Sequence, residues 1–232
     1  MDNNHILLQV QNVDFSFRKN HVLDHINFDI YAGESIAILG SNGSGKSTLL
    51  SILSGSRTCR GASVLYNGTD LLKDRKMRGK VMGYVPQSNP LIPELSILDN
   101  LLLWYPGSKQ ALLTTLERPE IAMLGIGDYL NKTARECSGG MKKRAGIAIA
   151  LLRDPDILLM DEPAAALDLE AKAELIRFLK TYLSSPGKTI LLSTHDENEL
   201  DVCTTLYALK QSKLELLPKD IRGAELIRAL HK

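Results

Sequence analysis

The sequence has few cysteines, almost no net charge and no long hydrophobic run. Three cysteines, Cys59, Cys137 and Cys203, are odd in number and widely spaced, which excludes a disulfide framework or a zinc site and favours a reducing compartment. The net charge of +1 excludes the overall basic character of a nucleic-acid-binding protein. No apolar run reaches the roughly 18 residues of a membrane span, and MDNNHILLQV lacks the features of a signal peptide. We therefore expect a cytoplasmic chain.

The length of 232 residues suits one core, or one core with a small additional subdomain. Apolar and polar residues alternate in LLQVQNVDFSF and HVLDHINFDIYAG, which predicts an antiparallel, half-exposed sheet in the first 33 residues. Four later runs are short and continuously apolar: SIAILG, KVMGYV, DILLM and TILLS. This pattern is typical of parallel strands that are buried on both faces.

Helical patterns separate these runs. They cover residues 47–53, the leucine-rich region 96–124, the run MKKRAGIAIALL and residues 169–183. The alternation of strands and helices predicts a three-layer α/β domain. The segment 218–232 has apolar residues near helical spacing and predicts a short amphipathic helix that packs on its own domain; these residues are Ile221, Leu226, Ile227 and Leu230.

Polar side chains follow each of the four buried runs. SIAIL leads into GSNGSGKST, KVMGYV into PQ, DILLM into DEP and TILLS into TH. In an open parallel sheet, ligands bind beyond the carboxyl ends of the strands. We therefore expect five side chains to converge there: Lys46, Gln87, Asp161, Glu162 and His195.

The segment GSNGSGKST matches the phosphate-binding pattern G-x-x-x-x-G-K-[ST] and lies between a predicted strand and a predicted helix. Its backbone N–H groups would surround a phosphate chain, Lys46 would reach the β and γ phosphates, and Ser47 would bind Mg²⁺. A glycine-rich turn that matches by chance is the alternative. The predicted phosphate-binding residues are Gly40, Ser41, Asn42, Gly43, Ser44, Gly45, Lys46, Ser47 and Thr48.

The two acidic residues after DILLM, Asp161 and Glu162, suit two different roles in phosphoryl transfer. Asp161 would lie near Mg²⁺, and Glu162 would orient or deprotonate an attacking water. Gln87 would contact the metal or that water, and His195 would bond the γ-phosphate. Each of these residues, taken alone, also fits an ordinary polar turn.

The stretch RECSGGMKKR begins a helical run with Ser138, a good N-cap, yet places three cations in its first two turns. Positive charge at a helix N-terminus is unfavourable in an isolated helix. An anion bound at this helix end would make the positive charges favourable. The simpler alternative is that Lys142 and Lys143 lie on a solvent-exposed basic face.

These motifs together resemble the ATP-binding subunits of ABC transporters, with CSGGM in place of the signature LSGGQ and DILLMDEP following it. The resemblance extends from the N-terminal sheet to about Leu217. It implies a P-loop NTPase of ABC ATPase type, with a mixed central sheet, an N-terminal antiparallel β subdomain and a helical subdomain. It also implies a head-to-tail pair of subunits, in which one subunit's signature contacts ATP held mainly by the other through Ser138, Gly139 and Gly140.

Further residues match the family one at a time. Phe17 matches the aromatic residue that stacks on adenine, although it also fits a packing role in the sheet. Asp168, in AAALD, matches a loop aspartate that crosses the dimer interface. Met141 replaces the usual glutamine of the signature and removes a hydrogen-bonding group close to the shared nucleotide, and Cys137 replaces a leucine.

The resemblance implies one ABC ATPase domain over residues 1–232. Residues 1–90 and 154–217 form a RecA-like core with the β subdomain, 91–153 the helical subdomain with the signature, and 218–232 a C-terminal helix. The cofactors would be ATP and Mg²⁺. The partners would be a second ABC ATPase subunit, identical or closely related, and separate transmembrane permease subunits that dock beside Gln87 near residues 88–98.

The expected function is therefore an ATPase on the inner face of the cell membrane that powers a transporter, with no nucleic-acid partner. The compact insert and the STHD ending favour an exporter. The main alternative is an ABC-type ATPase that acts on nucleic acid or ribosomes, but such relatives carry coiled coils, zinc insertions or tandem cassettes that this sequence lacks. A nucleotide-binding regulator and a metabolic kinase are further alternatives; Glu162 argues against the first and CSGGM against the second.

Overall fold

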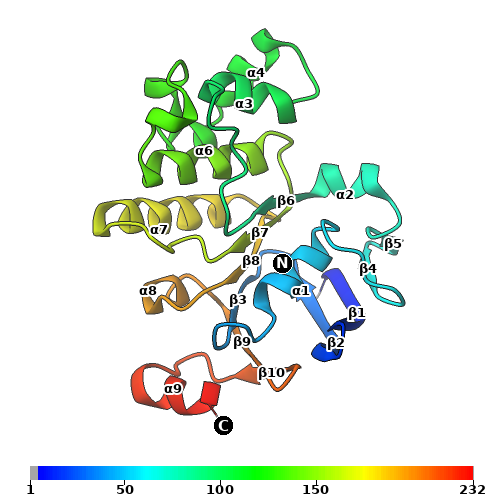
Figure 1. The fold of residues 1–232 in the computed structure, drawn as a ribbon. Helices are drawn as coiled ribbons and strands as arrows, with labels where there is room; N and C mark the ends of the chain where they lie inside the picture. The colour runs from blue at the N-terminus through cyan, green and yellow to red at the C-terminus, as the bar shows by residue number, and fades with distance from the viewer. Residues whose placement is uncertain (1–4, 232) are drawn as a thin grey trace.

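The computed structural model describes residues 5–231 of the chain (Figure 1). Residues 1–4 and 232, which the predicted domain boundaries include, lie outside the described residues. Two sheets organise the fold. The first is antiparallel, in the order β2-β1-β4-β5, and it consists of β1 (Ile6–Phe17), β2 (Asn20–Tyr31), β4 (Ser63–Tyr66) and β5 (Thr69–Asp70).

The second sheet is mixed, with the order β10-β9-β3-β8-β7-β6. All neighbouring strands are parallel except β9 and β10, which form an antiparallel hairpin. The strands are β3 (Ser35–Leu39), β6 (Met82–Val85), β7 (Ile157–Asp161), β8 (Thr189–Ser193), β9 (Thr205–Lys210) and β10 (Lys213–Leu217). The predicted fold class, including the mixed central sheet, is confirmed.

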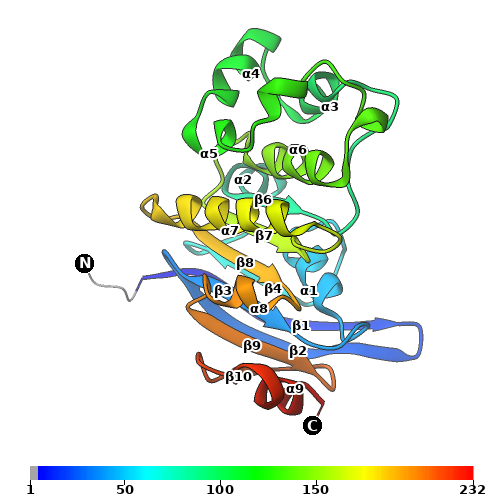
Figure 2. The ribbon, with the colours of Figure 1, turned by 90° about the vertical axis from the view of Figure 1, so that its left-hand side faces the viewer.

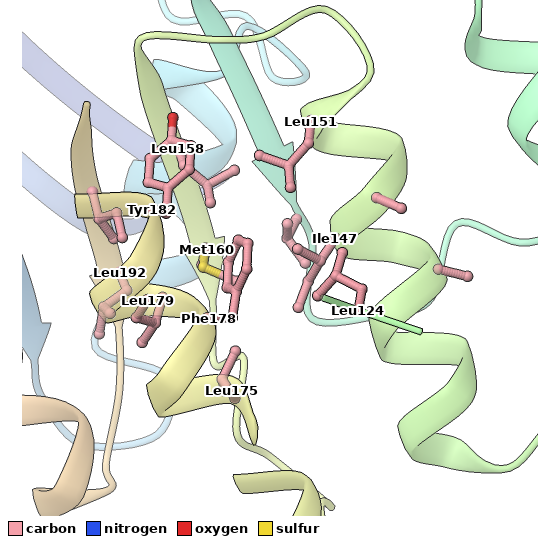
Figure 3. Close-up of a cluster of buried hydrophobic side chains, with 14 of the residues drawn as sticks. Leu124, Ile147, Leu151, Leu158, Met160, Leu175, Phe178, Leu179, Tyr182 and Leu192 are labelled. Atoms are coloured by element: carbon pink, nitrogen blue, oxygen red, sulfur yellow. The ribbon is translucent and has the colours of Figure 1, made fainter. Parts of the chain in front are cut away.

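The continuous apolar runs arise because β3, β7 and β8 are buried on both faces. Alternate residues of β7 enter two different cores: Leu158 and Met160 pack into one, Ile157 and Leu159 into the other. Figure 3 shows the first core, where Met160 of β7 meets Phe178 of α7 (Leu169–Ser184). The second core lies under α1 (Lys46–Leu53) and the antiparallel sheet.

A group of helices lies at one end of the molecule, beyond α7 (Figures 1 and 2). It consists of α3 (Ile97–Trp104), α4 (Lys109–Leu116), α5 (Pro119–Ala122), two 3₁₀ turns (Ile126–Tyr129 and Ala134–Glu136) and α6 (Gly139–Leu151). Serines cap α3, α4 and α6: Ser96, Ser108 and Ser138 each accept a hydrogen bond from a backbone N–H of the first helical turn. The remaining helices are α2 (Arg75–Val81), α8 (Glu197–Leu200) and α9 (Gly223–His231).

Two sequence expectations were wrong in detail. The strand predicted from Lys80 begins at Met82, because Asp74 caps the short helix α2, which continues to Val81. The predicted C-terminal helix begins only at Gly223, so Ile221 precedes it; Ile221 and Leu226 are buried, whereas Ile227 is 58% exposed because it lies on the outer face of α9. Within the described residues, none of the helices has the length and apolar character needed to cross a membrane.

Candidate functional site

The four polar strand ends predicted to converge do lie side by side. Strands β3, β8, β7 and β6 are consecutive in the sheet and parallel, so their carboxyl ends open onto one edge. A cavity of about 420 Å³ lies there. Its lining includes Phe17, Asn20, Lys46, Gln87 and Glu162, which come from four separate parts of the chain.

Close backbone packing explains the glycines of GSNGSGKST. A Cβ on Gly40 would lie 2.5 Å from the carbonyl oxygen of Leu209 and 2.5 Å from Oγ of Ser44. Gly45 has a φ of 110°, and a Cβ there would meet Val22 at 2.8 Å. Only glycine fits both positions without displacing the backbone. The loop therefore keeps the curled conformation that leaves its N–H groups available to an anion.

Lys46 is only 4% exposed and lies inside this loop. Its ammonium donates to the carbonyl oxygen of Gly40 at 2.8 Å and lies 3.0 Å from Nε2 of His195 and 3.7 Å from Oε1 of Glu162. Burial lowers the pKa of Lys46, and the charges of Glu162 and Asp161 oppose that effect. An anion in the cavity would add to the negative charge that Glu162 and Asp161 already place near this buried cation.

Asp161, at the end of β7, is 2% exposed and accepts two hydroxyl hydrogen bonds at one carboxylate oxygen. Ser47 Oγ donates to Oδ1 at 3.0 Å, and Ser193 Oγ donates to the same atom at 2.6 Å. The pairing of a hydroxyl with a carboxylate presents the hard oxygen ligands that Mg²⁺ prefers. Ser47 and Asp161 therefore fit a magnesium site.

Glu162 is held by its backbone and by two side chains. Its φ is 44°, in the left-handed region that a non-glycine residue rarely adopts, and its N–H donates to Ser193 Oγ at 3.0 Å. Gln87 Nε2 donates to Glu162 Oε2 at 2.9 Å, while His195 Nε2 lies 3.2 Å from Oε1. Such backbone strain is typical of functional sites, where the surrounding structure maintains it.

Phe17 lies at the mouth of the cavity with 45% of its surface exposed. Its ring packs edge-on against Phe15, with 5.0 Å between centroids, and the guanidinium of Arg57 lies 4.9 Å from its centroid. An exposed aromatic face at the edge of an anion-binding cavity is suited to stacking on a nucleobase.

The CSGGM segment lies apart from this cavity. Ser138 caps α6 by accepting from Met141 N–H at 3.2 Å, and Gly139 and Gly140 open that helix. No residue of CSGGM belongs to the described lining of the cavity that contains Lys46. Asp168 likewise caps α7, accepting from Ala171 N–H at 2.8 Å. The predicted residues therefore form two groups on this chain.

Sequence reasoning missed Ser193, which binds both Asp161 and the backbone of Glu162. The available signal was that Ser193 is a polar residue at the end of the buried run TILLS, as Asp161 and Glu162 are at the end of DILLM. Arg57 was missed because its contact with Phe17 joins distant parts of the chain.

A family model described as "ABC transporter" matches residues 23–165, more than half of the chain. The chain belongs to the ABC transporter family. Among ABC transporter relatives, it is 30% identical over 220 residues to the spermidine/putrescine import ATP-binding protein PotA of Bacteroides fragilis, a match that covers 93% of this chain and 48% of PotA. It is 32% identical to the Nod factor export ATP-binding protein I of Cupriavidus metallidurans, a match that covers 88% of this chain and 68% of that protein. The chain thus spans about half the length of the first relative.

Solved ABC cassettes show the same fold. The ATP-binding cassette MJ0796, in a dimeric post-hydrolysis state bound to ADP and Pi, superposes with a TM-score of 0.77 at 28% identity, covering 93% of this chain and 99% of that one. CbiO1 from Clostridium perfringens, part of the ABC transporter complex cbiONQ, gives a TM-score of 0.76 at 27% identity, covering 91% and 87% of the two chains. The family resemblance seen in the sequence is confirmed.

Proposed function

We propose that this chain is the ATP-binding and ATP-hydrolysing subunit of an ABC transporter. The observation that carries the proposal is that Lys46, Ser47, Gln87 and Glu162 line one cavity. His195 contacts both Lys46 and Glu162, and Ser47 donates to the buried Asp161. The names of these relatives describe transport, which favours this role over an ATPase acting on nucleic acid or ribosomes. The relatives include import and export proteins, so we propose ATP-driven transport without assigning its direction.

In this proposal the phosphates of ATP enter the glycine-rich loop, and Lys46 leaves the carbonyl oxygen of Gly40 to bond the β and γ phosphates. The residues Gly40 to Thr48 supply the loop, and Phe17 stacks on the base. Ser47 and Asp161 would hold Mg²⁺, with Gln87 nearby, and the bound metal would neutralise charge on the phosphate oxygens.

Glu162 is the proposed acceptor that orients the attacking water and takes its proton. Its two carboxylate oxygens bond Gln87 and His195, so both neighbours fix its direction. When ATP is bound, His195 turns from Lys46 towards the γ-phosphate. The side chains contribute mainly position and charge, which is how phosphoryl transfer is generally catalysed.

A second copy, or a close relative, completes the site in this proposal. Ser138, Gly139 and Gly140 lie outside the chain's own phosphate cavity, and a helix that begins with a serine cap and free N–H groups attracts an anion. The dimeric state of the similar cassette MJ0796 supports a paired arrangement. Asp168 would then contact the partner across the interface.

We also propose a docking region for separate permease subunits beside Gln87 and residues 88–98. Ile92 in this segment, and Leu103 and Trp104 at the end of the adjoining α3, are exposed apolar side chains, with exposures of 44%, 59% and 52%. The similar protein CbiO1 is described as part of a transporter complex. Through such a permease the chain would lie at the inner face of the membrane, with residues 91–153 as the helical subdomain, residues 1–90 and 154–217 as the core and 218–232 as the C-terminal segment that contains α9.

The test is ATP hydrolysis by mixtures of two inactive variants. Lys46→Ala removes phosphate binding but keeps CSGGM, and Ser138→Arg blocks CSGGM but keeps the phosphate loop. If sites are shared between copies, a mixed pair contains one site with both parts intact, and the mixture regains hydrolysis. A mixture as inactive as each variant, when the wild-type chain hydrolyses ATP and both variants are folded, would contradict the shared site.

A further inference from the structure

The buried acid Glu199 lies beside the proposed site and has no role in the mechanism above. It belongs to α8 and is 1% exposed. The hydroxyl of Thr194 is hydrogen-bonded to Glu199 Oε2, and the backbone N–H of Ala164 approaches the same carboxylate. The other oxygen, Oε1, is buried and accepts no hydrogen bond from the described residues.

The two groups that meet Glu199 come from different loops of the proposed site. Thr194 immediately precedes His195. Ala164 lies in the loop that begins with Glu162 and ends at Asp168, where α7 starts. These loops also meet directly where His195 Nε2 lies 3.2 Å from Glu162 Oε1, and a cavity of about 370 Å³ lies between them, lined by residues of both and by Glu199.

The network extends from Glu199 to the first turn of α7. Thr194 Oγ1 accepts the backbone N–H of Asp196 at 2.9 Å, and Asp196 Oδ2 accepts from Lys172 Nζ at 2.7 Å. Lys172 follows Asp168 by one helical turn. A displacement of Asp168 and the start of α7 would therefore be transmitted to Thr194 by two routes, one through Ala164 and Glu199 and one through Lys172.

Four charged or titratable side chains interact with Glu199 from neighbouring elements. Lys143 of α6 attracts its carboxylate, Asp196 repels it, and Lys172 of α7 and the Cys203 thiol lie within electrostatic range. Burial dominates and raises the pKa of Glu199 to about 7. Burying the Oε1 atom without a hydrogen bond costs free energy, and a movement that brings a donor to this atom would remove the cost.

We propose that Glu199 is a positioning residue that joins the loop carrying Asp168 to the loop carrying His195, and that Oε1 accepts the Ala164 N–H fully as the loops close on nucleotide. The inference rests on the proposed roles of Asp168 and His195. Contact of Asp168 with a partner then moves His195 towards the phosphates, so that pairing and hydrolysis occur together. Glu199 touches neither nucleotide nor water itself.

The test is a double-mutant cycle on ATP hydrolysis with Glu199→Ala and His195→Ala. Glu199→Ala should lower kcat about 10- to 100-fold, the range that loss of outer-shell positioning groups costs at metal sites. The Kd for ATP should not change, because the phosphate loop is untouched. Since Glu199 acts through His195, the double variant should lose much less than the product of the two single losses. Losses that multiply, or an unchanged kcat in Glu199→Ala, would overturn the proposal.

Matched variants keep this test decisive. Thr194→Val keeps the shape and removes the bond to Glu199, so it should lower kcat like Glu199→Ala; an unchanged kcat overturns the proposal even where Glu199→Ala does not fold. Glu199→Gln keeps an acceptor for Ala164 and should stay close to the wild type. Glu225→Ala removes an exposed glutamate of α9 as the control. Glu162→Gln tests the proposed hydrolysis mechanism separately from the role of Glu199. If Glu162→Gln still hydrolyses ATP, the proposed mechanism itself is refuted.

Discussion

Replacing Glu199 with glutamine should change how the free energy of unfolding depends on pH. The carboxyl group has an ordinary pKa of 4.5 in the unfolded chain, and burial raises it to about 7 in the fold. At about 1.4 kcal/mol per pH unit, ionisation of Glu199 costs the folded chain about 3 kcal/mol more than the unfolded chain. The side chain is 1% exposed, so water does not screen this cost appreciably.

The sign follows from the raised pKa. The stability that comes from a protonated Glu199 is fully present below about pH 4.5 and is lost as the pH rises through about 7. A glutamine does not titrate. Between pH 5 and pH 8 the wild-type chain should therefore lose about 2 to 3 kcal/mol of unfolding free energy relative to Glu199→Gln.

Urea denaturation of both proteins at pH 5 and pH 8 measures this difference. Other titrating groups are common to the two chains and cancel when the variant is subtracted from the wild type. A difference that stays constant between the two pH values would refute the reasoning. A difference of opposite sign would mean that Lys143 and the hydrogen bond from Thr194 outweigh burial and lower the pKa.

Three other substitutions test separate parts of the structure. Phe17→Ala should raise the Kd for ATP about 2- to 10-fold by loss of stacking, whereas Phe17→Tyr should not; equal Kd values would show that Phe17 only packs in the sheet. Gly83→Ala places a Cβ 2.5 Å from the backbone of α6 and should cost about 1–3 kcal/mol in thermal unfolding, whereas Gly79→Ala, whose nearest contact would be 3.7 Å, should cost nothing. Tyr182→Phe removes a buried 2.8 Å hydrogen bond to the carbonyl oxygen of Pro155, which also accepts from Lys188 Nζ at 2.8 Å, and should cost about 0.5–1.5 kcal/mol by chemical denaturation; an unchanged midpoint would mean that the Lys188 bond alone satisfies this carbonyl.

The sequence predicted the structure best at positions where only one type of residue is physically possible. A continuously apolar run such as TILLS requires a strand buried on both faces, and the polar residue after it must lie at the ligand edge of a parallel sheet. This reasoning was enough to bring Lys46, Gln87, Glu162 and His195 to one place. The glycines of the phosphate loop were equally clear, because a Cβ at Gly40 has no room.

Other features depend on contacts between distant residues and leave no local pattern. Ser193 resembles any serine at a strand end until the fold places it between Asp161 and Glu162. Glu199 resembles a surface glutamate of a polar helix, and only the packing of α8 beneath two loops buries it. The start of β6 was predicted two residues too early because Val81 extends the apolar run MGYV. The structure instead places Lys80 and Val81 in the helix α2, which Asp74 caps.

The oligomeric state of Glu162→Gln, measured by light scattering with and without Mg·ATP, tests the central claim most directly. This variant keeps the phosphate loop and loses the proposed water-orienting carboxylate, so bound ATP should persist. The account predicts an ATP-dependent dimer that disappears when Ser138→Arg is added to the same chain. A variant that binds ATP but stays monomeric, or a dimer that survives Ser138→Arg, would contradict the claim that two copies of this chain share their nucleotide sites through CSGGM.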